Sequence, residues 1–185
     1  MHKIQKQTAW WILALIGIGV VSRLIPHMHN FTPLGGIALF SAAYIGKRHW
    51  SLLVPLFTLW ISDVFLNNFV YSEYVTGWNR WFGFGWSYLG FAMIVGLGWL
   101  LLQKINLTRV LGSALTASVL FFLLSNFGVW LGSTMYPPTG EGLMLCYAAG
   151  IPFFWKSVLG TVGFSLVFFS TYEWATSHRL LWEKA

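Results

Sequence analysis

Six apolar stretches, separated by short polar segments, constrain this chain to one class of fold. They cover residues 8–23, 31–46, 51–67, 85–103, 110–132 and 151–172. A helix needs about 20 apolar residues to cross ~30 Å of hydrocarbon. With 57% hydrophobic and only 9% charged residues, the chain also lies outside the composition of soluble domains. We therefore expect an all-α integral membrane protein, with six transmembrane helices packed as one compact bundle and a single domain over residues 1–185.

The first two stretches are the least regular. The second starts with Pro33, Gly35 and Gly36, which predict a loop or a broken turn before a short or tilted helix. The first follows Lys3 and Lys6 as the core of a secretory signal would, but no small-residue cleavage site comes after it. We expect this segment to be retained as a helix.

The Lys and Arg residues between the stretches are unevenly distributed, which predicts the orientation in the membrane. With six spans, one side carries Lys3, Lys6, Lys47, Arg48, Lys104, Arg109, Arg179 and Lys184. The other side carries Arg23, Arg80 and Lys156. Because cytoplasmic loops are enriched in Lys and Arg, both termini should be cytoplasmic in a multi-pass protein of the bacterial inner (plasma) membrane. The net charge of +6 then reflects this topology and attraction to anionic membrane lipid, and its dispersal in short loops argues against a nucleic-acid partner.

Polar side chains gather in the half of the bundle next to the other, outer side. In the third stretch Trp60, Asp63 and Asn67 share one helical face, because they are three and four residues apart. The fifth stretch repeats this spacing with Asn126 and Trp130. An ionisable group at membrane depth usually faces a polar interior, so we expect these faces to border a cavity.

Two interpretations of the ionisable residues remain open. Asp63 and Lys156 can form a buried structural pair that neutralises itself. Alternatively, they flank a cavity together with Arg23 and bind opposite ends of a polar ligand. Asn126 has the same two interpretations, because it can instead make a hydrogen bond between helices.

The first outer loop contains His27 and His29, a spacing that permits metal binding if Asp63, Glu73 or Cys146 completes the site. A loop folded back over the helices by its prolines explains the same residues more simply. We therefore expect no metal site, although a metal-dependent membrane enzyme stays as a third hypothesis for the chain.

The other two outer loops are aromatic or long. Trp81 lies in a loop crowded with aromatic side chains, which either anchor the membrane interface or line a pocket. The segment from Tyr136 to Tyr147 is long for a membrane hairpin, and loops of that length tend to be lids or binding elements. The chain has no Ser/His/Asp set at a common depth and no nucleotide-binding motif, so we expect neither an enzyme nor a bound cofactor.

Short strings over nearly the whole chain carry a family resemblance. They are Arg23-Leu-Ile-Pro-His, Asn30-Phe-Thr-Pro, Ala38-Leu-Phe, Ser62-Asp63, Ser125-Asn126-Phe-Gly-Val-Trp130, Tyr136-Pro, Gly142-Leu, Cys146-Tyr and Ile151-Pro-Phe-Phe. They resemble an uncharacterised family of bacterial membrane proteins described as putative transport proteins. That family in turn resembles the substrate-binding S components of energy-coupling factor (ECF) vitamin transporters, through size, topology and a few short strings.

The resemblance implies six helices with cytoplasmic termini and a substrate pocket at the outer side, closed by the first, third and fifth loops. It also implies partners: an ECF-type scaffold subunit and ATPases, docked on small residues of the first helices, with the subunit tipping over in the membrane to carry its ligand inward. Two features depart from the S-component pattern. The first helix has no regular alanine-every-four motif, and Thr161 stands after Gly160 where an acidic residue would be expected.

The leading hypothesis is a substrate-binding membrane subunit for uptake of a small nutrient, such as a vitamin or its precursor. Aromatic walls would stack on the apolar part of this small-molecule ligand while polar residues hold the rest. The predicted binding residues are Arg23, His27, His29, Asn30, Trp60, Asp63, Asn67, Trp81, Asn126, Trp130, Tyr136, Cys146 and Lys156. The alternative is a non-transporting membrane scaffold or assembly protein that binds a protein partner through its outer loops, and it predicts an outer half packed without a cavity near Asp63.

Overall fold

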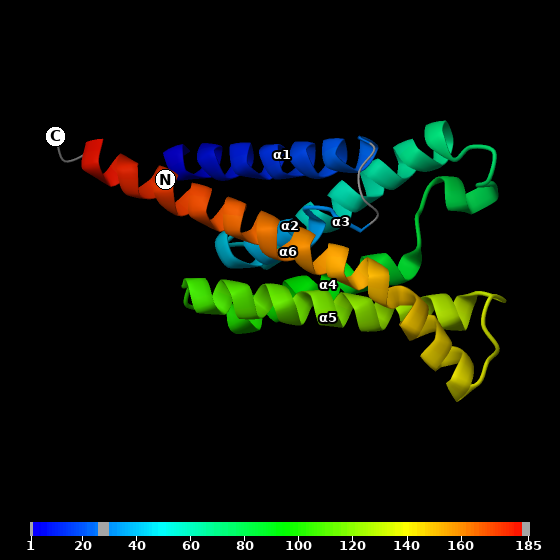
Figure 1. The fold of residues 1–185 in the computed structure, drawn as a ribbon. Coiled ribbons are helices and arrows are strands. Elements are labelled where there is room, and N and C mark those ends of the chain that lie inside the picture. The colour runs from blue at the N-terminus through cyan, green and yellow to red at the C-terminus, as the bar shows by residue number, and fades with distance from the viewer. Residues whose placement is uncertain (1, 26–29, 183–185) are drawn as a thin grey trace.

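Residues 2–25 and 30–182, the part of the chain that the computed structural model describes, form six α-helices in a layered bundle (Figure 1). Side chains are described for residues 10–25 and 30–176. The helices are α1 (His2–Leu24), α2 (Leu34–Tyr44), α3 (Arg48–Phe65), α4 (Gly85–Leu101), α5 (Leu107–Gly132) and α6 (Gly140–Trp182). A π-helical turn, Leu66–Val70, continues α3, and a 3-10 turn, Gly77–Arg80, precedes α4. The expected all-α class is confirmed, since all regular structure in these residues is helical.

Successive helices run in alternating directions, so their connections gather at two ends of the bundle (Figure 1). One end holds the connections 45–47 and 102–106, together with the start of α1 and the end of α6. The opposite end, which we call the Arg23 end, holds the last turn of α1 and the connections 66–84 and 133–139. This is the alternation that the order of the six apolar stretches predicts.

Three of the helical segments in the described residues are long and apolar enough to cross a membrane: Arg48–Val70, Leu107–Gly132 and Gly140–Thr176. Three shorter apolar helices accompany them, Trp10–Leu24, Leu34–Tyr44 and Gly85–Leu101. Large apolar side chains point outward along several helices, as a hydrocarbon environment requires. Leu13, Leu115 and Val167 are examples, each about half exposed.

The short helix α2 lies at the centre of the bundle and contacts all five of the others. Every residue from Leu34 to Ser41 is buried. The expected loop or broken turn at Gly35 and Gly36 is wrong, because both lie inside the helix. Their lack of a side chain serves packing instead: a Cβ on Gly35 would clash with Thr161, and one on Gly36 would lie 2.9 Å from the backbone nitrogen of Ser165. Both of these neighbours belong to α6.

An aromatic cluster fills the core between α1, α2 and α6. Phe40 of α2 lies at its centre, 1% exposed. Its ring centroid is 5.5 Å from those of Phe169 and Tyr172, and 6.0 Å from that of Trp11. The cluster joins two helices from the start of the chain to its last helix, so it ties the two ends of the sequence together well away from the Arg23 end.

Helix α6 begins about ten residues earlier than the apolar stretch indicates. The segment from Tyr136 to Tyr147 was expected to be a long loop, but only residues 133–139 connect α5 to α6. Thr139 caps the new helix, since its Oγ1 accepts a hydrogen bond from the backbone N–H of Gly142 at 3.2 Å. Pro152 lies inside the helix and has no N–H to donate, and the helix changes direction near this point, between its yellow and orange parts (Figure 1).

Candidate binding site

An ion pair joins α1 to α3 at the Arg23 end. Nη1 of Arg23 lies 2.7 Å from Oδ1 of Asp63. The same nitrogen donates to the carbonyl oxygen of Leu59 at 3.2 Å and to the hydroxyl of Ser62. The arginine is held in one place by α3, because a single nitrogen contacts three acceptors of that helix.

The other oxygen of Asp63 is also occupied. The hydroxyl of Tyr88, on α4, donates to Oδ2 at 2.8 Å. The backbone of Gly83 covers the carboxylate so closely that a Cβ there would clash with it. Asp63 is therefore 6% exposed, and its carboxylate links three helices rather than facing open space.

Of the two interpretations of these ionisable residues, the structural pair of Asp63 with Lys156 is wrong, because Asp63 pairs with Arg23. Lys156 is half-buried on α6, and its Nζ lies 5.9 Å from the ring centroid of Phe153. That contact is a cation–π interaction. A pairing between distant helices depends on which helices are neighbours, and α1 packs directly on α3.

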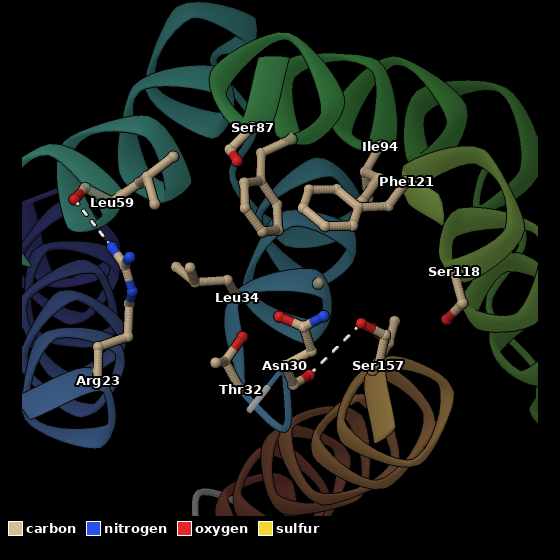
Figure 2. A pocket seen from close by; sticks show the side chains of 13 residues that line it. Arg23, Asn30, Thr32, Leu34, Leu59, Ser87, Ile94, Ser118, Phe121 and Ser157 are labelled. Carbon is tan, nitrogen blue, oxygen red and sulfur yellow. Dashed lines mark hydrogen bonds between the residues drawn. The ribbon is translucent and has the colours of Figure 1, made fainter. Parts of the chain in front are cut away.

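A cavity of about 140 Å³ lies next to this ion pair (Figure 2). Arg23 of α1 forms part of its wall, and so do Asn30 and Thr32 from the segment before α2. Each of the helices α2, α3, α4, α5 and α6 also contributes lining residues. The remaining lining residues are Leu34, Gly35, Leu59, Ser87, Phe91, Ile94, Ser118, Phe121, Ser157 and Thr161. Figure 2 shows Arg23 at one edge of the cavity, with Asn30 and Ser157 facing it from the other side.

A second cavity, of about 220 Å³, adjoins the first. The two share four lining residues: Asn30, Ser87, Phe121 and Ser157. The walls of the second are otherwise aromatic and amide-bearing, with Phe84, Phe122, Ser125, Asn126, Val129, Gly150, Phe153 and Phe154. Together the two cavities reach the lower end of the volumes of small-molecule sites, which begin at roughly 300 Å³.

Backbone geometry holds the shared wall in place. Asn30 has a φ of +65°, a left-handed conformation that asparagine tolerates better than most residues. Its carbonyl accepts a hydrogen bond from Ser157 Oγ at 3.5 Å. Gly160, one turn further along α6, approaches the backbone of Thr32, where a Cβ would lie 3.0 Å from the Thr32 nitrogen. The segment before α2 is therefore fastened to α6 at the cavity.

Three of the predicted binding residues line the two cavities, namely Arg23, Asn30 and Asn126. The side-chain amide of Asn126 also donates to the carbonyl of Phe122 at 2.8 Å, within α5. Asn126 thus borders a cavity, as one of the two interpretations expects, and the hydrogen bond that its amide donates lies within α5 rather than between helices.

Other predicted residues have structural contacts outside these cavities. The Nδ2 of Asn67 donates to the carbonyl of Asn79 at 2.8 Å and so fastens the connection before α4. Trp130 does the same for the connection before α6, since its Nε1 donates to the carbonyl of Pro137 at 3.0 Å. Cys146 is buried, and its thiol lies 3.3 Å from the carbonyl oxygen of Asn126.

Three predicted aromatic residues also lie away from the two cavities. Trp60 stacks on Phe57 with ring centroids 5.6 Å apart. Trp81 is 54% exposed, and Tyr136 is partly exposed. Their positions are typical of interface residues rather than of a cavity wall.

His27 and His29 lie outside the described residues. Within the described residues, no group of three His, Cys, Asp or Glu side chains is close enough to hold a metal ion.

The hydroxyl residues of the cavity walls are not among the binding residues predicted from the sequence. Ser157 and Thr161 lie one turn apart on α6, and Ser118, Phe121 and Ser125 follow one another at helical spacing on α5. Polar residues at spacings of three and four in an apolar helix were a usable signal. It was overlooked because only amide and ionisable side chains were considered.

The comparisons with known proteins give one match. The model of a family described as "Family of unknown function (DUF6580)" covers residues 3–182. Neither the characterised proteins nor the solved structures include a significant match to this chain.

Proposed function

The chain belongs to the family of unknown function DUF6580, and from its geometry we propose that it is a substrate-binding membrane subunit for uptake of a small nutrient. The single observation that carries this proposal is the pair of adjoining cavities inside the bundle, lined by polar groups and phenylalanine rings together. A few convergent polar groups in a mainly apolar pocket are the usual composition of a small-molecule site.

The position of the cavities supports binding from one side of a membrane. Their lining residues come from the last turn of α1, the start of α2, the second half of α3, and residues 84–94, 118–129 and 150–161, which run from the middle of α4, α5 and α6 to their Arg23-end halves. All of these segments lie toward the Arg23 end. In the proposed arrangement six helices cross the bacterial inner membrane with cytoplasmic termini, so that the Arg23 end is the outer end. The alternation in Figure 1 and the distribution of Lys and Arg both support this orientation.

Within the site, the ligand contacts Arg23, Asn30, Asn126 and the serine hydroxyls, while phenylalanine rings cover its apolar part. Asp63 acts indirectly by fixing Arg23, because both of its oxygens are engaged in the protein. Uptake also needs an energy source. The proposal therefore includes ECF-type partners, a membrane scaffold subunit and ATPases, since the chain contains no nucleotide-binding motif of its own.

The alternative of a membrane scaffold predicts an outer half without a cavity near Asp63. A cavity lined by Arg23, the ion-pair partner of Asp63, favours the binding subunit instead.

The test blocks the cavities and measures retained ligand. Ser157 borders both cavities, so Ser157→Leu places an isobutyl group into them. Val167→Leu is the matched control, because it adds one methylene on the exposed face of the same helix. Each protein is purified in mild detergent, and extracted small molecules are identified by mass spectrometry against a mock purification.

We expect the wild-type protein and Val167→Leu to retain a common compound that Ser157→Leu lacks, while all three keep similar melting temperatures. If no compound is enriched over the mock purification, or if Ser157→Leu retains it equally, the cavities are not a substrate site.

A further inference from the structure

The charges around the cavities carry an inference about the ligand, which rests on the proposed function. Among the lining residues that the structure describes, Arg23 is the only one with an ionisable side chain. Its charge is already balanced by Asp63, whose carboxylate lies 2.7 Å away. The walls that meet a ligand are therefore close to neutral as a whole.

The partial burial of this pair strengthens the argument. The side chain of Asp63 is 8% exposed and that of Arg23 is 20% exposed, so solvent screens the two charges poorly. A second charge brought into the cavities would lose its hydration shell without gaining a free counter-charge. Transfer of an unpaired ion into such surroundings is strongly unfavourable.

Lys156 is a second cation close to the cavity walls. It follows the lining residue Phe153 by three positions on α6, and its Nζ lies over that ring at 5.9 Å from the centroid. Lys156 itself lines neither cavity. The contact that the structure shows for this charge is therefore with an aromatic ring of the cavity wall.

The neutral polar groups are versatile donors and acceptors. Ser118 donates to the carbonyl of Ala114 at 2.8 Å and Ser157 donates to that of Asn30, which leaves the lone pairs of both hydroxyls available. The amide of Asn30 offers a further donor and acceptor. These groups match an uncharged ligand with its own amide, carbonyl or hydroxyl groups.

The apolar walls are predominantly aromatic. The rings of Phe91 and Phe121 pack with centroids 4.8 Å apart, and those of Phe122 and Phe154 with centroids 4.9 Å apart. All four rings line the cavities. Offset and edge contacts between aromatic rings are favourable at such distances, so a planar ring is the shape that these walls accommodate best.

We infer that the ligand is an uncharged aromatic or heteroaromatic molecule, held at its ring by the phenylalanines and at its polar substituents by Asn30 and the serine hydroxyls. The balanced Arg23–Asp63 pair selects against both anions and cations of the same shape.

Three probes that share a phenyl ring but differ in charge test this selection. At neutral pH benzamide is uncharged, benzoate is an anion and benzylamine is a cation. Binding to the full chain in detergent is measured by saturation-transfer NMR. The signal from Ser157→Leu in the same detergent is subtracted, which removes partition into micelles.

We expect benzamide to bind at least about tenfold more tightly than either charged probe. Asp63→Asn leaves the charge of Arg23 unbalanced while an amide oxygen remains for Tyr88. This variant should shift the preference toward benzoate by about tenfold, whereas Lys156→Gln should leave the order of the three probes unchanged.

Two results would overturn the inference. If the wild-type protein prefers benzoate or benzylamine, the site binds small molecules but does not select neutral ones, so the proposed function stands alone. If none of the probes binds more to the wild-type protein than to Ser157→Leu, both the inference and the proposed function fail.

Discussion

The ion pair between Arg23 and Asp63 makes a quantitative prediction about stability. Asp63→Ala removes the 2.7 Å ion pair and the 2.8 Å hydrogen bond from Tyr88, and it leaves the guanidinium with its contacts to Leu59 and Ser62. Two unit charges about 4 Å apart attract by about 4 kcal/mol at an effective dielectric constant of ~20. Loss of one partner from a buried pair typically costs about 3–5 kcal/mol. Because Arg23 keeps 20% exposure, we expect the lower end, a decrease of about 3 kcal/mol in the free energy of unfolding.

A double-mutant cycle separates the pair from its surroundings. Arg23→Ala alone should lower the free energy of unfolding by at least about 3 kcal/mol, because it leaves the more buried Asp63 unpaired, and the double variant should lose about 2 kcal/mol less than the sum of the single variants. The assay is unfolding in mixed micelles with rising SDS content, followed by tryptophan fluorescence. Additive losses would mean that the coupling free energy between the two side chains is zero. The proposed role of Asp63 in fixing Arg23 would then be refuted.

Three further variants test the packing of the bundle. Gly36→Ala should lower the free energy of unfolding by about 1–3 kcal/mol, because the added methyl meets the backbone of α6, whereas Gly163→Ala has open space and should be neutral in the same SDS titration. Phe40→Ala should cost about 3–5 kcal/mol by opening the aromatic core, and an unchanged SDS midpoint would contradict the described cluster. Asn67→Ala should speed proteolytic cleavage within the connection 71–84, since the side chain no longer holds the carbonyl of Asn79, and an unchanged cleavage rate would show that this bond does not order the connection.

The positions of most helices followed from the sequence because apolar length and periodicity are local properties. The third, fourth and fifth stretches match α3, α4 and α5 to within a few residues at each end. The early start of α6 was missed, because glycines and prolines around Thr139 are typical of a loop and the capping hydroxyl alone did not outweigh them.

The partners of the polar residues were harder to predict because they depend on which helices become neighbours. From the sequence, either Arg23 or Lys156 could be the partner of Asp63. Only the packing of α1 on α3 selects Arg23. Hydroxyl groups are equally ambiguous, since a serine or threonine in an apolar helix often bonds to its own backbone. Thr58 does so without lining either cavity, whereas Ser118 does so and lines one of them.

The central position of α2 makes the middle of the bundle depend on both halves of the chain. Its 11 residues extend about 16 Å, roughly half of the ~30 Å of hydrocarbon in a membrane, so this helix depends on its neighbours for most of its packing. Its surface fits against α4 and α6, which are synthesised after it. The environment of α2 is therefore complete only when α3, α4 and α6 are all packed around it. The cavities beside α2 likewise take their walls from residues 23–59 and 84–161, so they exist only in the bundle that both halves of the chain have formed together.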